Sequence, residues 1–279
     1  MPGWVAPVYA PLAWQWSPAE VRRYALAVGA PYSVIDRRDL RLVTTNEPDV
    51  LPTFASLLAD GHSLRNVPLR GLTFDPLDVI YAGHEVELTG PLRPTTAGTS
   101  TSRILDVGDV RSGVLVRRET VSRDGDDRVI ARNVVTSVIR RASVGRTADV
   151  GVAVPEQLSG DIATLVVPTL DRQALFYAET GDHNPLHVDP EAARRAGFER
   201  PILHGLCAFG MVVHRVVRDL ADQGWQGVRA TGVRFTAPIV PGEEIIVRAA
   251  RSGDIIRFES FVGDRRVQSH GHVDLESMH

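Results

Sequence analysis

Hydrophobic and polar positions follow a helical period early in the chain and alternate further along. The run Ser17-Pro18-Ala19-Glu20 combines a serine cap, a first-turn proline and a glutamate three residues after the cap, which is typical of a helix start. Between residues 79 and 141, β-branched residues alternate with polar ones, which favours strands. The elements predicted for this half are an extended lead-in at 1–16, helices at 17–28 and near 51–60, strands at 84–89, 102–107, 113–122 and 129–140, and a turn at 124–126.

The second half repeats this order after a polar, glycine-containing stretch at 142–162 that suits a linker. Its predicted elements are a strand at 163–167, a helix at 171–180, a helix starting at Asp189-Pro190, a long apolar helix at 205–220, and strands at 228–237, 244–251, 255–262 and 266–273. Gly29 and Gly181 lie 152 residues apart, and Leu51 and Ile202 lie 151 apart. Pro-x-x-Pro runs recur 147 residues apart. These nearly constant offsets indicate a duplicated unit.

Each unit is predicted to combine a long helix with an antiparallel sheet, so the fold class is α+β, a sheet wrapped on one helix. We expect the units to span residues 1–145 and 160–279. The length of 279 residues is enough for two modest domains that each bury a core.

Composition excludes several classes of function. The net charge of -3 gives no basic footprint, so no nucleic-acid partner is expected. The chain contains no lysine, which removes Schiff-base chemistry and the phosphate-loop lysine. A single cysteine, Cys207, excludes an intrachain disulfide or a cysteine-based zinc site. Without a transmembrane-length apolar run, a signal segment or a peroxisomal C-terminal tripeptide, we expect a cytoplasmic protein with no membrane partner.

One stretch concentrates chemically active side chains. Residues 181–187 read Gly-Asp-His-Asn-Pro-Leu-His, so a carboxylate, a carboxamide and an imidazole fall within six residues, 182–187. Pro185 prevents one uninterrupted helix, so Asn184-Pro185 is predicted to be a turn with Asp182 and His187 on its two sides. Such a turn can aim an acid and an imidazole at one small volume, as general acid–base chemistry requires.

Two other interpretations compete with this one. In the first, Asp182 is an ordinary turn aspartate and His187 an ordinary surface histidine. That interpretation is adequate for either residue alone, but it explains their occurrence together less well. A metal site is the second, because His183 and His187 are four residues apart with Asp182 adjacent. Pro185 disfavours it, because that spacing presents two imidazoles to one zinc only on an unbroken helix.

The run Gly181-Asp182-x-Asn184-Pro185-x-His187, followed by His204-Gly205, resembles the MaoC-like (R)-specific enoyl-CoA hydratases. The hydratase 2 type, with two hot-dog units in one chain, is the closer match. In the first half, residues 24–30, 51–54 and 87–94 are similar to the non-catalytic unit of those enzymes. The resemblance therefore covers nearly the whole chain and implies a double hot-dog fold and hydration of trans-2-enoyl thioesters to (3R)-3-hydroxyacyl thioesters, or the reverse dehydration.

Hydration needs a base for the attacking water, an acid for C2 and stabilisation of the thioester oxygen as it gains enolate charge. Asp182 and His187 fit the two proton-transfer roles, and the sequence leaves open which one is the base. Asn184 can hold the water or fix the imidazole. Gly205 opens the long helix, so its N–H, strengthened by the helix dipole, can bind the oxyanion.

Two further positions follow from the resemblance alone. Phe235 matches a family position that contacts the bound thioester. Tyr81 falls where the family contacts the coenzyme portion of the ligand, although Tyr81-Ala-Gly-His84 departs from the usual His-Gly. Arg111 is one candidate for the phosphates of coenzyme A.

The duplication also predicts a single site per chain. By the 152-residue offset, Asp182 corresponds to Ala30 and His187 to Ile35, so the first unit lacks both titratable groups and is expected to form a substrate-binding wall.

The expected substrate is a thioester of coenzyme A or of acyl carrier protein, with no metal and no separate cofactor. A homodimer is possible, and the sequence leaves open whether the chain is a monomer or a dimer. A hot-dog thioesterase and a non-catalytic acyl-thioester-binding subunit are the alternative functions.

Overall fold

The computed structural model describes residue 7, residues 9–66, residue 69, residues 71–149 and residues 158–277. Within these residues one ten-stranded antiparallel sheet has the order β1-β3-β4-β5-β2-β7-β10-β9-β8-β6. Its first five strands are β1 (Leu12–Trp16), β2 (Val79–Leu88), β3 (Thr96–Val110), β4 (Gly113–Asp124) and β5 (Val129–Ile139). The others are β6 (Ala163–Pro168), β7 (Val228–Phe235), β8 (Glu244–Ser252), β9 (Ile255–Val262) and β10 (Arg265–Leu275).

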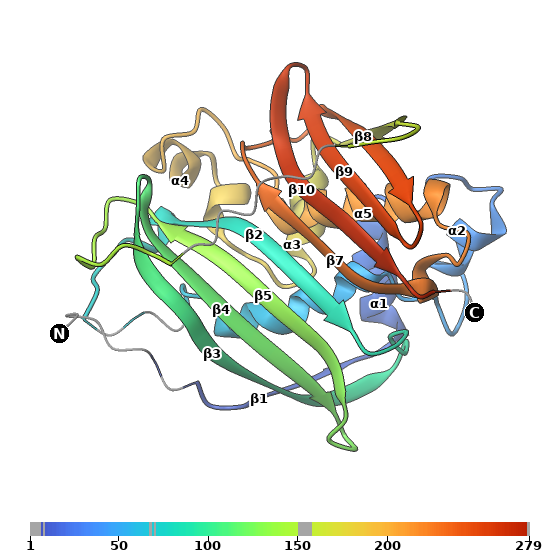
Figure 1. Ribbon diagram of the computed structural model, residues 1–279, viewed down its shortest axis with the longest axis horizontal. Helices are drawn as coiled ribbons and strands as arrows, with labels where there is room; N and C mark the ends of the chain where they lie inside the picture. The colour runs from blue at the N-terminus through green and yellow to red at the C-terminus, as the bar shows by residue number, and fades with distance from the viewer. Residues whose placement is uncertain (1–6, 8, 67–68, 70, 150–157, 278–279) are drawn as a thin grey trace.

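The strand order confirms the duplication. Outward from the centre, one side runs β2, β5, β4, β3, β1 and the other runs β7, β10, β9, β8, β6. Each strand of the first unit therefore occupies the same place as the strand of the second unit whose number is five higher. The two units meet where β2 pairs with β7, from Gly83 opposite Arg234 to Glu87 opposite Ala230. Figure 1 shows these two strands side by side between a green and a red lobe. The structure thus confirms the α+β double hot-dog fold.

The helices of the first unit are α1 (Pro18–Ala27), α2 (Arg37–Arg41), and two 3₁₀ helices, η1 (Pro52–His62) and η2 (Pro76–Asp78). Those of the second unit are α3 (Gln173–Ala178), η3 (Pro185–His187), α4 (Pro190–Arg195), α5 (Gly205–Leu220) and η4 (Trp225–Gly227). The predicted capping box at Ser17 is present, with its side chain accepting from Ala19 N–H. No helix in the described part of the chain is long and apolar enough to span a membrane.

The helix predicted near 51–60 is present, but it is of the 3₁₀ type and shorter than its counterpart in the second unit. The apolar segment near 51–60 forms the 11-residue η1, whereas α5 has 16 residues. Gly61 near the end of η1 is a poor α-helix former. The prediction also missed β1, a five-residue strand at the sheet edge whose side chains are mostly exposed.

A single large apolar core joins the two units. α5 packs on β6, β7, β8 and η1, and η1 packs on β2, β3, β4 and β5. Most of α5 is buried because its apolar residues cover nearly its whole circumference. The boundaries at 145 and 160 stay predictions, and part of the proposed linker, residues 150–157, lies outside the described residues.

Candidate active site

A tight turn between α3 and η3 positions the two predicted proton carriers. Gly181 has a φ of 116°, a conformation that L side chains rarely adopt, and it redirects the chain after α3. The Asp182 carboxylate then accepts the Asn184 N–H at 3.2 Å, and the Asn184 side chain accepts the Leu186 N–H at 3.2 Å. Pro185 begins η3 and His187 ends it. Two consecutive side-chain-to-backbone bonds therefore fix the geometry between Asp182 and His187.

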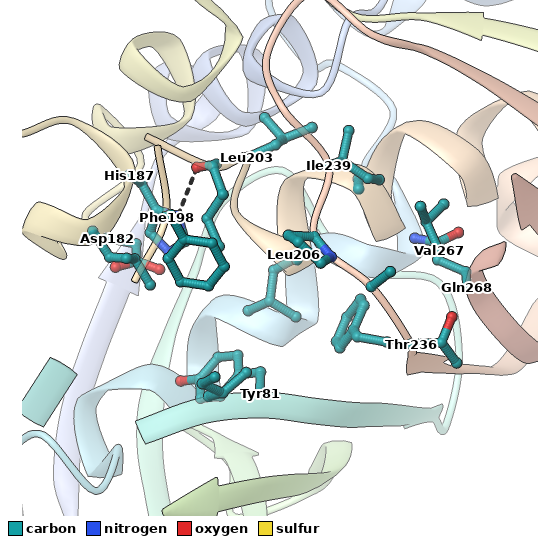
Figure 2. A pocket seen from close by; sticks show the side chains of 18 of the residues that line it. Tyr81, Asp182, His187, Phe198, Leu203, Leu206, Thr236, Ile239, Val267 and Gln268 are labelled. Atoms are coloured by element: carbon teal, nitrogen blue, oxygen red, sulfur yellow. Dashed lines mark hydrogen bonds between the residues drawn. The ribbon is translucent and has the colours of Figure 1, made fainter. Parts of the chain in front are cut away.

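His187 is buried and neutral. Its Nδ1–H donates to the Ile202 carbonyl at 2.8 Å, which leaves Nε2 as the acceptor nitrogen. Burial and the neighbouring His204 lower the pKa of His187 to about 3, although the Asp182 charge opposes them. The dashed line in Figure 2 marks the bond to Ile202. At neutral pH this ring offers a lone pair and carries no acidic proton on Nε2.

His204 belongs to the same site, and sequence analysis did not assign it a role. Its ring lies on the His187 ring with centroids 3.9 Å apart. His204 Nε2–H donates to the Asp182 backbone carbonyl at 3.1 Å, and burial lowers the pKa of His204 to about 4. His204 therefore packs on the His187 imidazole and holds the Asp182 backbone at the same time. Its position in the His204-Gly205 pair was the only signal in the sequence.

Asp182, His187 and His204 place one ligand-type atom each within 4.8 Å of one another, so the described residues contain a candidate metal group. His183, which the metal interpretation used, is exposed and outside this group. The hydrogen bonds of the two rings limit what they can offer a metal. His187 Nδ1 and His204 Nε2 already face the Ile202 and Asp182 carbonyls, which leaves one nitrogen on each ring.

A cavity of about 250 Å³ opens beside this cluster. Asp182 and His187 lie at one end in Figure 2, and Thr236 and Gln268 lie at the other. Most of the wall between them is apolar, including Leu203, Leu206 and Ile239. The first unit contributes Arg65 and the start of β2, so the cavity lies at the junction of the two units.

The cavity brings together five of the six predicted site residues: Tyr81, Asp182, His187, Gly205 and Phe235. Gly205 is the first residue of α5, where backbone N–H groups have no intrahelical acceptor. A Cβ on Gly205 would lie 3.3 Å from the Phe235 ring, so these two residues are closely packed.

Asn184 is the sixth predicted residue. It is buried beside the cavity, and its oxygen is committed to the turn while its Nδ2 has no partner among the described residues. Arg111 is exposed and does not line the cavity, whereas Arg65 does.

The first unit also supplies a carboxylate that the sequence did not reveal. Tyr81 donates its hydroxyl to Asp60 at 3.0 Å, and the Arg65 guanidinium lies 5.6 Å from the centre of the Tyr81 ring. Burial, then the negative charge of Asp182, raise the pKa of Asp60. Asp60 is thus close enough to Asp182 for the two charges to interact across the junction. A lone aspartate at the end of an apolar helix gave no sign of this pairing.

Comparison with known proteins assigns the family. The MaoC like domain matches residues 156–272, and the MFE-2 hydratase 2 N-terminal domain matches residues 14–141. The chain is 32% identical over 248 residues to the enoyl-CoA hydratase ChsH3 of Mycobacterium tuberculosis, covering 87% of this chain and 86% of that protein. The chain belongs to the MaoC-like hydratase 2 family.

Members of this family occur alone and within larger proteins. The peroxisomal enoyl-CoA hydratase 2 of Arabidopsis thaliana is 28% identical, over 93% of this chain and 90% of its own length. The solved peroxisomal multifunctional enzyme type 2 of Drosophila melanogaster superposes with a TM-score of 0.81 at 29% identity. That match covers 95% of this chain and 48% of the fly enzyme, so the chain spans about half of it.

Proposed function

We propose that this protein hydrates trans-2-enoyl-CoA to (3R)-3-hydroxyacyl-CoA and catalyses the reverse dehydration. The observation that carries this function is the acidic and imidazole pair at one end of an apolar cavity, beside the N-terminus of a long helix. Relatives named enoyl-CoA hydratase 2 and 3-hydroxyacyl-thioester dehydratase support the same reaction. The 3R product rests on the family resemblance.

The water is held between Asp182 and His187. Nε2 of neutral His187 accepts one hydrogen bond from it, and the Asp182 carboxylate lies within reach of the same water. As the water oxygen attacks C3, one proton passes to the Asp182–His187 pair and the C2–C3 π electrons move toward the thioester carbonyl. The pair then returns one proton to C2, so the reaction balances without an external acid or base. Because the two groups interact, the proton belongs to the pair.

The enolate oxygen needs donors where its charge develops. The Gly205 N–H at the start of α5 supplies one, and the aligned peptide dipoles of the helix add to it. Absence of a side chain at Gly205 lets the thioester approach the backbone beside Phe235. Removing one such donor typically lowers kcat by about 10²–10³.

The remaining assignments extend this proposal. The substrate is a thioester of coenzyme A or acyl carrier protein, with the first unit as its binding wall and Tyr81 and Phe235 as contacts. The reaction uses no metal and no separate cofactor, and the chain acts in the cytoplasm. Dialysis against a strong chelator tests the metal assignment: hydration is expected to persist, and a loss reversed by zinc would contradict it.

A direct assay tests the function. Crotonyl-CoA and a longer trans-2-enoyl-CoA should lose their conjugated absorbance on addition of the protein, without release of free thiol. Chiral analysis should find the 3R alcohol, and a 3S product would overturn that stereochemical assignment. Free coenzyme A without loss of the enoyl group would replace the hydratase with a thioesterase.

A further inference from the structure

A buried amide lies at the end of the cavity opposite the catalytic pair. Gln268 on β10 is 0% exposed and lines the cavity, yet its Nε2 has no acceptor among the described residues. Its Oε1 accepts the hydroxyl of Ser260, also 0% exposed, at 2.8 Å. Ser260 lies opposite Gln268 on the neighbouring strand β9. The serine therefore fixes the amide so that its donor end is left for something other than the protein.

An irregularity in β10 explains why this residue reaches the cavity. Consecutive residues of a regular strand point to opposite faces of the sheet, but Val267 and Gln268 both line the cavity. The pairing of β10 with β9 shifts register on both sides of Gln268, between Arg266 and Gln268 and again before Gly271. Such bulges re-aim side chains next to binding sites.

Leaving a buried amide donor without an acceptor costs stability. A ligand oxygen in the cavity removes that cost when it binds. The neighbouring wall is largely apolar. Among the described residues at that end of the cavity, Gln268 is the polar side chain that is wholly buried. Thr236, its polar neighbour, is exposed and donates its hydroxyl to the Arg266 carbonyl at 2.7 Å.

We propose that Gln268 is a specificity-determining residue that donates a hydrogen bond from Nε2 to a carbonyl or hydroxyl oxygen of the bound thioester, away from the reacting carbons. This inference rests on the proposed thioester substrate and adds a recognition contact to it. Two parts of the substrate carry such an oxygen: the amide carbonyls of the pantetheine arm, and an oxygenated acyl chain. A site that prefers an oxygen rejects the analogue lacking it, because the amide is then buried without a partner.

Binding of thioesters that cannot react separates recognition from catalysis. Isothermal titration calorimetry would compare wild type with Gln268→Met, a variant of similar size without the donor. The probes are butyryl-CoA, octanoyl-CoA and octanoyl-CoA bearing a keto group at its distal end. Loss of one buried hydrogen bond should raise Kd by about 5- to 20-fold.

The pattern across probes identifies the oxygen. A raised Kd for all three probes supports the proposal and assigns the hydrogen-bonded oxygen to a pantetheine carbonyl. A raised Kd for the keto probe alone supports the proposal and assigns that oxygen to the acyl chain. Ser260→Ala, which frees the amide to rotate, should give a smaller loss on the same probes. Kd values of Gln268→Met within twofold of wild type for every probe would overturn the proposed role of Gln268.

Asn133 provides a matched control. It is a wholly buried amide on β5, the strand equivalent to β10, and both its ends are satisfied, by His84 at 2.9 Å and by the Ala55 carbonyl at 3.1 Å. Asn133→Thr should lower Tm and leave the ratios of Kd among the probes unchanged. A wild type that binds the thioesters but hydrates no enoyl-CoA would remove the proposed hydratase alone, and one that binds none would remove both proposals.

Discussion

The two units of this chain share a strand order but use their interiors differently. In the second unit, the segment after α3 turns inward and buries His187, which is 8% exposed. Ile35, the residue that the repeat offset assigns to the same place in the first unit, is 89% exposed. The central helix further along the chain is the 16-residue α5 in the second unit and the 11-residue η1 in the first.

Buried amides show the same contrast. Asn133 in the first unit bonds to protein at both ends, whereas Gln268 in the second lines the cavity and bonds to protein at one end of its amide, with Nε2 lacking a partner among the described residues. Of these two amides, the one in the first unit is satisfied within the protein, and the one in the second keeps a donor without an acceptor. The first unit still contributes Tyr81 and Arg65 as a wall. The two units therefore share a fold, and the few side chains that differ between them account for their different chemistry.

Replacing the catalytic pair tests the contrast most strongly. Asp182→Asn and His187→Ala should each lower kcat by at least about 10², because each removes a positioned proton carrier. The double variant should lower kcat by less than the two single reductions combined, since both side chains act on one transition state. Steady-state kinetics on an enoyl-CoA provides the measurement. A thermal melt of the nearly isosteric Asp182→Asn should match wild type, and near-normal turnover in that variant would refute the mechanism.

Removing the Tyr81 hydroxyl tests the first unit as a wall. Tyr81→Phe leaves the Asp60 carboxylate without its phenol donor and alters the cavity surface, so KM should rise by about 5- to 10-fold with a smaller change in kcat. Full initial-rate curves separate the two constants. A kcat loss as large as that of Asp182→Asn would mean that the first unit takes part in the chemistry.

Acid should destabilise both units before it inhibits the chemistry. Burial lowers the pKa of His84 in the first unit to about 4, and those of His187 and His204 in the second to about 3 and about 4. Between pH 6.5 and 4 the unfolded chain therefore binds protons that the folded chain excludes, so stability falls as pH falls.

Thermal unfolding at pH 7 and pH 5 should show a Tm lower by at least about 5 °C at the acidic value. At a temperature where the protein stays folded, titration of His187 should not reduce kcat/KM over the same range. An activity loss with an apparent pKa near 6.5 that His187→Ala abolished would contradict the neutral buried ring.

The smallest effect is expected at the counterpart of His187. Ile35→Val changes one methylene on an exposed loop, so kcat and Tm should both stay within experimental scatter of wild type. Ala30→Ser, at the counterpart of Asp182, should keep kcat within a few-fold although its site is buried. Loss of turnover in either variant, with the fold intact by circular dichroism, would refute the assignment of one site per chain.

The sequence by itself determined most of the elements and pointed to Asp182 and His187 as the candidate acid–base pair. Caps at Ser17 and Asp189, the apolar run from Gly205 and the alternating strands are local patterns, so they predicted most helices and strands, although β2 and β3 extend well beyond the predicted 84–89 and 102–107. Asp182 and His187 lie five residues apart across a proline turn, so a short piece of chain was enough to indicate that they meet.

The tertiary structure alone decided which distant residues complete the site. Asp60 comes from the first unit, where Tyr81 donates to it, and the place of both beside the second unit depends on the pairing of β2 with β7. Of these two, only Tyr81 was predicted, through the family resemblance. Gln268 faces the cavity because a register shift in β10 breaks the alternation that sequence analysis assumes. Long-range strand pairing and local irregularities leave no periodic trace in the sequence, and the residues that they bring together become visible only once the sheet is assembled.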